Sequence, residues 1–306
     1  MTALPAQDKP DSSSSPPAQI GGSGSGGTRR GLIARSLRQR RAQIGLVLVS
    51  IVILVVVLGP LIAPYTTTEF VGKPFEQSSS GTVFGTDSLG RDVWSRFLGG
   101  GHTLLILAVL ATILGVGGGA LVGILAAYRR GWIDETIMRL GDIALAFPEI
   151  VLALLFLSII GPEMWLMVLL VGLAHLPRVA RVMRGAALSV VERDFVKSAE
   201  AVGIPRWKIM LTEILPNTTG TLAVEFGLRL TYSIGIVAGL NFLGLGLQPP
   251  AADWGLMINE NRVGITVQMW PVLLPVVAIA ILTVGTNLIT DGIARASAGI
   301  GRGVEK

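Results

Sequence analysis

Long apolar runs dominate the chain and predict helices that cross a membrane. A helix needs about 20 mainly apolar residues to span the hydrocarbon core. Three of the runs are free of charge, and the other three contain ionisable residues. In chain order the runs cover 44–63, 103–128, 137–160, 164–181, 218–243 and 270–290. The pattern predicts an all-α, polytopic membrane protein with six transmembrane helices.

Composition supports this prediction and excludes several classes of function. Hydrophobic residues make up 51% of the 306 residues and charged residues only 15%, whereas soluble domains carry about 25% charged residues. The absence of cysteine excludes disulfides and cysteine-bound metal centres. The two histidines, His102 and His175, are too few for a histidine-rich metal site. Most basic residues lie between the spans, so the net charge of +5 does not indicate a nucleic-acid partner.

The distribution of Lys and Arg predicts the orientation. With the N-terminus in the cytoplasm, the four inner segments hold seven, three, seven and three basic residues, against four in the outer segments. This excess follows the rule that basic residues stay on the cytoplasmic side. We therefore expect a cytoplasmic tail rich in Ser, Gly, Pro and basic residues over 1–43, disordered at its start, a membrane domain over 44–292 and a cytoplasmic tail over 293–306.

The outer segment 64–101 contains the motif FGTDSLGRDVWSR at 84–96. A short helix there would carry apolar side chains on one side and place Trp94 at the level of the lipid headgroups. Asp87, Arg91 and Asp92 could contact an external binding protein or brace their own loop.

The segment 191–216, between the fourth and fifth spans, is longer than an ordinary helix connection. Apolar residues at helical spacing would share a face at Val191, Phe195, Ala199 and Val202. Gly203 suits the left-handed position that ends a helix, and Pro205 suits the first turn of the next. Acidic and basic residues are balanced in this segment, unlike a lipid-binding helix. It is either a docking surface for a protein or a solvated loop packed on itself.

This segment resembles the EAA loop of ABC importer permeases. The matching residues are Lys197-Ser198-Ala199, Gly203 and the ILPN sequence ending at Asn217, with Lys-Ser-Ala in place of Glu-Ala-Ala. The motif at 84–96, GWIDETIMRLGDIALAFP at 131–148 and NFLGLGLQPPAADWG at 241–255 are similar to the dipeptide/oligopeptide/nickel branch. The similarity runs over 46–292, and its order resembles the second of the two permeases. An acidic residue often found before FLGLG is missing from 236–239.

The resemblance implies a type I ABC importer permease fold in a bacterial cell membrane. It also implies that the EAA loop docks in a groove of an ATPase, through Lys197, Ser198, Ala199, Glu200, Ala201, Gly203, Ile204, Pro205 and Trp207. The expected partners are a homologous second permease, two ATPase subunits or domains, an extracytoplasmic solute-binding protein and membrane lipid. The chain has no phosphate-binding loop, because its Gly72-Lys73 pair precedes Pro74. We expect no enzymatic activity, metal or cofactor in this chain, with ATP and Mg bound by the partner ATPases.

Charged residues within spans are costly and are candidates for the translocation path. Glu225 and Arg229 are four residues apart and can pair on one helix face. Asp142 and Glu149 are seven apart and would share a face of the third span. Each of these four could line the path, and each also has a structural explanation. His175 is expected to be a packing residue, and a stripe of arginines could gate the path or anchor its helix at the headgroups, at Arg178, Arg181 and Arg184.

Two other functions remain open. The same machinery could import nickel complexes or another small solute instead of di- or oligopeptides. A self-contained secondary transporter is an alternative of a different class. Such proteins carry ion-coupling residues within their own spans and show internal repeats, whereas this sequence has few ionisable residues in its spans and no visible inverted repeat.

Overall fold

The computed structural model describes residues 39–79 and 81–297, and its regular structure is helical. The longest helices are α2 (Arg40–Ile62), α4 (Gly101–Arg129), α7 (Met164–Val191), α11 (Thr219–Phe242) and α13 (Trp270–Ser297). Shorter helices are α3 (Val93–Gly99), α5 (Gly131–Leu145), α6 (Glu149–Ile160), α8 (Asp194–Ala201), α9 (Arg206–Ile209), the π-helix η1 (Met210–Ile214), α10 (Leu215–Asn217), α12 (Trp254–Asn261) and the 3₁₀-helix η2 (Arg262–Gly264).

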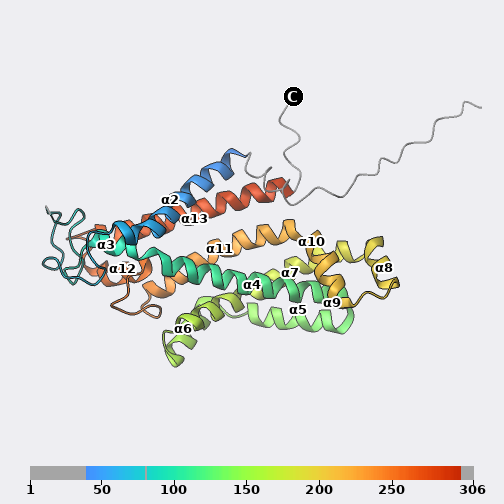
Figure 1. The fold of residues 1–306 in the computed structure, drawn as a ribbon. Helices are drawn as coiled ribbons and strands as arrows, with labels where there is room; N and C mark the ends of the chain where they lie inside the picture. The colour runs from blue at the N-terminus through green and yellow to red at the C-terminus, as the bar shows by residue number, and fades with distance from the viewer. Residues whose placement is uncertain (1–38, 80, 298–306) are drawn as a thin grey trace, which may run out of the picture.

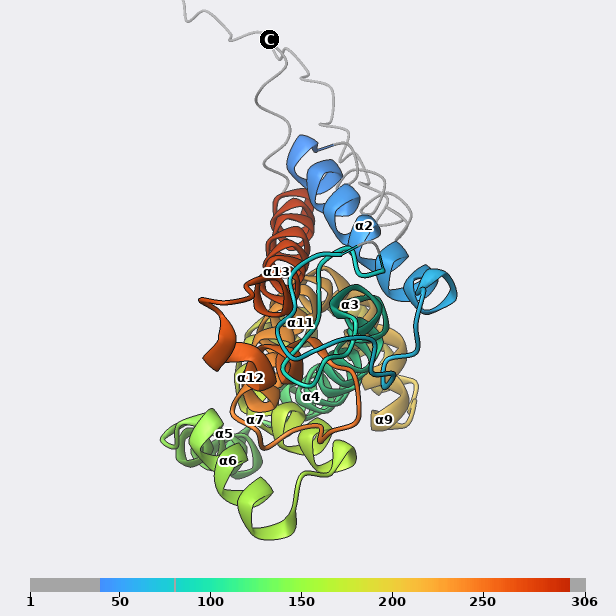
Figure 2. The same cartoon turned by 90° about the vertical axis from the view of Figure 1, so that its left-hand side faces the viewer.

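The helices form an elongated bundle with different structures at its two ends (Figure 1). The loop before α3, α3 itself and α12 gather at one end, while α8, α9 and α10 lie at the opposite end. Viewed along the bundle, α11 lies among α4, α7 and α13, with α2 on one side and α5 and α6 on the other (Figure 2). The two groups of short helices that flank the spans are therefore separated by the length of the bundle.

Five helical segments among the described residues are long and apolar enough to cross a membrane, and the bent pair α5–α6 passes the same test when its two helices are counted together as one span. The prediction of a single third span over 137–160 is wrong in its shape, since α5 and α6 meet at an angle of 76°. Pro148 explains the break, because its ring cannot continue a helix. The fourth span is also longer than predicted, since α7 continues to Val191.

Two further expectations need correction. The first helix begins at Arg40, inside the expected tail, and α13 continues into the other tail as far as Ser297; the remaining tail residues, 1–38 and 298–306, lie outside the described residues. The short helix α3 is not an interfacial helix. It leads into α4, and it buries Val93 and Phe97 against the protein because the outer loop covers it.

Glycine allows α4 and α7 to approach until their backbones touch. A Cβ atom at Gly115, Gly119 or Gly123 of α4 would lie 2.7, 2.8 or 2.3 Å from a carbonyl oxygen of α7. Small residues at a spacing of four provide this close contact where no hydrophobic effect drives helices together.

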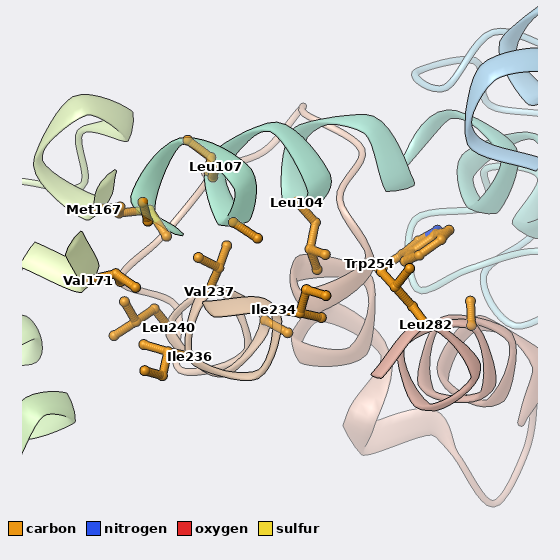
Figure 3. Packing of buried hydrophobic residues seen from close by; sticks show 14 of the residues in the cluster. Leu104, Leu107, Met167, Val171, Ile234, Ile236, Val237, Leu240, Trp254 and Leu282 are labelled. Carbon is orange, nitrogen blue, oxygen red and sulfur yellow. The ribbon is translucent and has the colours of Figure 1, made fainter. Parts of the chain in front are cut away.

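Two apolar clusters fill the bundle. The first joins α4, α7, α11, α12 and α13 around residues such as Leu104, Met167, Val237 and Trp254 (Figure 3). The second continues the contact of α4 with α7 toward the other end of the bundle and adds side chains from α8, α9 and η1.

The glycine contact predicts a position-dependent effect on stability. Gly123→Ala should destabilise the fold by about 1–3 kcal/mol, because the methyl group would overlap the Ala180 carbonyl oxygen. Gly117→Ala on the same helix is the control, since nothing lies within 4 Å of its Cβ. It should be neutral or stabilise by up to about 1 kcal/mol. Thermal unfolding in detergent measures both, and equal melting temperatures would contradict the prediction.

Candidate functional site

The segment after α7 forms the expected unit of helix, glycine turn and helix. α8 ends at Ala201, and Gly203 has a φ of +83°, as predicted for this position. Two details differ from the prediction. Pro205 precedes the first residue of α9 instead of lying within its first turn. The second helix was expected to end at Pro216, but a π-helical turn carries the chain into α10 and on to Asn217.

Residues 194–217 are called the coupling loop below. The buried side of this loop belongs to the same apolar cluster as α4 and α7. Val196, Ala199, Ile209 and Ile214 pack there against side chains of both helices. The predicted apolar face is therefore wrong: Phe195 is exposed and Val196 is buried in its place. The reason is that α7 continues to Val191 and α8 starts afresh at Asp194, which changes the direction of the helix axis.

The outer side of the coupling loop exposes large apolar side chains. Val202 is 80% exposed and Trp207 is 66% exposed, and Phe195 and Leu211 are also exposed. Among the predicted contact residues, Ala199 is buried and Ile204 half-buried, while the exposed ones are Lys197, Ser198, Glu200, Ala201, Gly203, Pro205 and Trp207. An exposed apolar patch bordered by charges is typical of a protein-docking surface.

The arginine stripe of α7 pairs with acidic residues of α5 and α6. Arg178 bonds Glu149, Arg181 bonds Asp142 and Arg184 bonds Asp134. Asp142 and Glu149 do not share one helix face, because the bend lies between them. The stripe lies within α7, which continues past it to Val191. The signal available in the sequence was that three arginines follow a segment with four acidic residues, of which Glu135 pairs with Arg139 in the same segment.

The pairing predicted for Glu225 and Arg229 on α11 is confirmed. Arg229 Nε lies 3.0 Å from Glu225 Oε2, and both side chains are largely buried. The Arg229 guanidinium also lies 5.5 Å from the ring centre of Tyr232, a cation–π contact. The fifth span therefore contains one ion pair with no net charge.

His175 takes part in a polar contact that sequence reasoning missed. Its Nε2 atom lies 2.9 Å from Ser233 Oγ, which lies 2.9 Å from Thr112 Oγ1. These buried groups link α7, α11 and α4. No local pattern indicates such a chain, because its members lie more than 50 residues apart.

At the opposite end of the bundle, Asp87 and Arg91 brace their own loop. Asp87 is fully buried, and its Oδ2 lies 2.7 Å from Arg91 Nε and 3.4 Å from Arg96 Nε. Both arginines also bond Glu260 of α12, at 2.9 and 2.8 Å. Buried charges need such partners. Glu260 was not among the predicted site residues, because nothing in its local sequence distinguishes it.

Asp92 and Trp94 complete the attachment of α3. Asp92 caps the helix by accepting hydrogen bonds from the backbone N and hydroxyl of Ser95. Trp94 is half-buried and stacks on Phe97, with 5.6 Å between the ring centres. Its position is therefore fixed by contacts within the protein.

Asp253 fixes α12 to the end of α11. Its Oδ1 accepts hydrogen bonds from Gly255 N and Asn241 Nδ2, each at 2.8 Å. Burial raises the pKa of the Asp253 carboxyl to about 6, and these hydrogen bonds oppose the rise. Trp254 donates from Nε1 to the Phe97 carbonyl oxygen at 2.9 Å. The loop before α3, α3 and α12 thus form one compact cap.

Comparison with known proteins identifies the family. Residues 119–298 match the family described as the inner membrane component of binding-protein-dependent transport systems. This range begins within α4 and includes the coupling loop, α11 and α13. The chain belongs to this family. Residues 31–79 of the permease also match the N-terminal transmembrane domain of oligopeptide transport permease C.

Curated relatives place the permease in the peptide and glutathione branch of ABC importers. It is 34% identical over 261 residues to the glutathione transport system permease protein GsiD of Pectobacterium atrosepticum, covering 85% of this chain and 87% of that protein. GsiD of an Escherichia coli strain is 35% identical over 263 residues, covering 85% and 86%. A Brucella suis protein, named provisionally as a peptide transport system permease, is 37% identical over 266 residues, covering 86% and 89%.

The permease also shares its fold with a solved transporter. An inward-facing structure of the MetNI methionine ABC transporter superposes with a TM-score of 0.54 at 19% identity, covering 66% of this chain and 96% of that one. The expected type I importer permease fold is confirmed.

The buried pair on α11 generates a stability prediction. Arg229→Ala should destabilise the permease by roughly 3–5 kcal/mol, because it leaves Glu225 as a lone buried charge. The double variant with Glu225→Ala and Arg229→Ala should lose less, since no unpaired charge remains. Thermal unfolding and uptake are measured on both. A double variant less stable than Arg229→Ala would contradict the charge-pair explanation.

Proposed function

We propose that the permease imports di- or oligopeptides as one of two membrane subunits of an ATP-driven importer. It forms half of the translocation path and does not itself hydrolyse ATP. The observation that carries this proposal is the coupling loop, which has an exposed apolar patch on one side and the core of α4 and α7 on the other.

The packing of the coupling loop supports a direct mechanical link. A partner that moves Trp207 and Val202 would also move Val196 and Ile209, which pack within the α4–α7 cluster. Because α4 and α7 touch through glycine, they would shift together. The arginine pairs would then carry the motion to α5 and α6.

The translocation path is proposed to follow α5, α6, α7 and α11. These helices carry the candidate residues Asp142, Glu149, Glu225 and Arg229, which are costly inside a membrane unless they face water or one another. Asp142 and its partner Arg181 have side chains that are 63% and 54% exposed, which is consistent with a water-filled surface.

The proposed assembly contains a homologous second permease, two ATPase subunits or domains that bind ATP and Mg, and a solute-binding protein outside the membrane. The compact cap offers the binding protein a rigid surface. Asp87, Arg91 and Asp92 are buried and stabilise the cap through contacts within it. Membrane lipid would contact the apolar outer faces of helices such as α2, whose Val57 and Leu61 are exposed.

Peptides are favoured over nickel complexes because the relatives' names refer to glutathione and peptide transport. A secondary transporter is the alternative of a different class. Copurification of an ATPase with the permease, and dependence of uptake on ATP, distinguish the two; uptake that proceeds without an ATPase would overturn the proposal.

Orientation gives a test of its own. We expect both termini in the cytoplasm, because basic residues concentrate in the segments on that side. A cysteine introduced at Ser79, in the outer loop, should react with an impermeant thiol reagent in intact cells. A cysteine at Ser297 should react only after the cells are opened, and the reverse pattern would contradict the orientation.

The coupling loop gives a second test. Gly203→Val should uncouple transport, because a β-branched residue strongly disfavours a φ of +83° while open space surrounds the position. Gly203→Asn is the matched control, since Asn tolerates the left-handed region. Uptake and substrate-stimulated ATP hydrolysis should fall about tenfold or more in the valine variant. A tenfold loss corresponds to about 1.4 kcal/mol in the free energy of the coupled conformation. Basal ATP hydrolysis and assembly of the complex should be retained.

A change on the exposed side separates docking from loop folding. Trp207→Ser should weaken copurification of the ATPase without lowering the melting temperature of the isolated permease, because Trp207 is 66% exposed. Ala199 is unsuitable for this purpose, since it is buried and a larger residue would disturb packing. If both Gly203→Val and Trp207→Ser keep normal uptake and normal stimulation, the coupling loop is not the transmitting element.

A further inference from the structure

An apolar pocket lies between α4, α5 and α7. Its volume is about 420 Å³, within the range of small-molecule sites. Its lining is almost wholly apolar and includes Val122, Met138, Gly141, Leu173 and Pro177, together with Arg181. Gly141 has no side chain to fill this space, and a Cβ atom there would lie 3.5 Å from Pro177 Cβ.

An exposed ion pair borders the pocket. Arg181 lines it and bonds Asp142, the residue that follows Gly141. More than half of each side chain is exposed, although both residues belong to helices of the membrane domain. Glu135 and Arg139 form a neighbouring ion pair on α5. The Arg139 side chain is 75% exposed, more than that of Arg181 or Asp142. Charges this exposed need water or a polar partner, so this pair is accessible to a polar solute from the side of α5.

The charges of these helices cancel in pairs. Every Asp, Glu and Arg of α5, α6, α7 and α11 has a partner of opposite sign: Asp134 with Arg184, Glu135 with Arg139, Asp142 with Arg181, Glu149 with Arg178, and Glu225 with Arg229. Such a surface offers neighbouring positive and negative groups without a net field of either sign. It complements a solute that carries both charges, and it does not attract a metal cation or a strongly charged solute.

We propose that the Arg181–Asp142 pair and the apolar pocket form a subsite for a neutral, zwitterionic peptide with an apolar side chain. The guanidinium of Arg181 binds the peptide carboxylate, Asp142 binds its ammonium group, and the side chain enters the pocket. The internal ion pair is exchanged for two with the solute, so little binding energy is gained and release stays easy. This subsite rests on the proposed function, and it specifies the solute class.

Reciprocal charge variants test the polar half of the subsite. Uptake of Ala-Phe, Ala-Lys and Ala-Glu is compared in proteoliposomes holding the complete transporter, so the binding protein is the same throughout. Arg181→Gln leaves Asp142 uncompensated and should raise the uptake of Ala-Lys relative to Ala-Phe by about fivefold, the scale of an exposed charge contact. Asp142→Asn should raise the ratio for Ala-Glu instead, and the double variant should return both ratios toward the parent values.

Ratios keep this test valid if the variants fold less well, because lost protein lowers all three peptides alike. An equal decrease for all three peptides in both single variants would show that the pair only braces α5 and would overturn the subsite. Loss of ATP dependence would instead contradict the proposed function, so the two failures are distinguishable.

Filling the pocket tests the apolar half. Gly141→Leu should reduce uptake of Ala-Phe about tenfold relative to Ala-Ala, because the leucine side chain occupies the space of the peptide side chain. Gly117→Leu is the control for the same exchange at an open position of α4. If the pocket holds a lipid acyl chain, Gly141→Leu should change uptake of both peptides equally and shift the melting temperature in a lipid-dependent way; that result would overturn the proposal.

Discussion

The backbone contact between α4 and α7 is the constraint on which the rest of this permease depends. Gly115, Gly119 and Gly123 bring the two helices so close that any side chain at these positions would overlap a carbonyl oxygen. The pair then acts as one body to which other parts attach. The coupling loop packs onto one end of it, α5 and α6 attach through the arginines of α7, and α11 attaches through Ser233.

Charge pairing is the second organising feature, and it follows from the low dielectric of the surroundings. An isolated charge in a membrane span is costly, whereas a pair with good geometry is tolerated. The pairs differ in exposure: Glu225 with Arg229 is largely buried, while Asp142 with Arg181 is open. A buried pair mainly avoids a penalty, whereas the proposed subsite requires an open pair such as Asp142 with Arg181, whose exposed groups a solute can reach.

The two ends of the bundle are built for different tasks. One end is held by a buried network of Asp87, Arg91, Arg96 and Glu260 and by stacked aromatic rings, so it is rigid. The other end is held by apolar packing and exposes Trp207 and Val202. Helices held by apolar contacts can shift together without breaking ion pairs. An exposed apolar patch is typical of a surface that a partner covers. This contrast agrees with the two docking surfaces proposed above, a fixed one for the binding protein and a moving one at the coupling loop.

Sequence alone determined the features that depend on neighbouring residues. Hydropathy located the spans, the requirement for positive φ located the turn at Gly203, and helical spacing predicted the pairing of Glu225 with Arg229. Tertiary structure decided the rest, because the partners are distant in the chain. Glu260 lies more than 160 residues from Arg91 and Arg96, and Arg181 meets Asp142, 39 residues earlier in the chain, only where α7 packs against α5. The buried face of α8 was also decided there, since continuation of α7 to Val191 rotated Val196 into the core in place of Phe195.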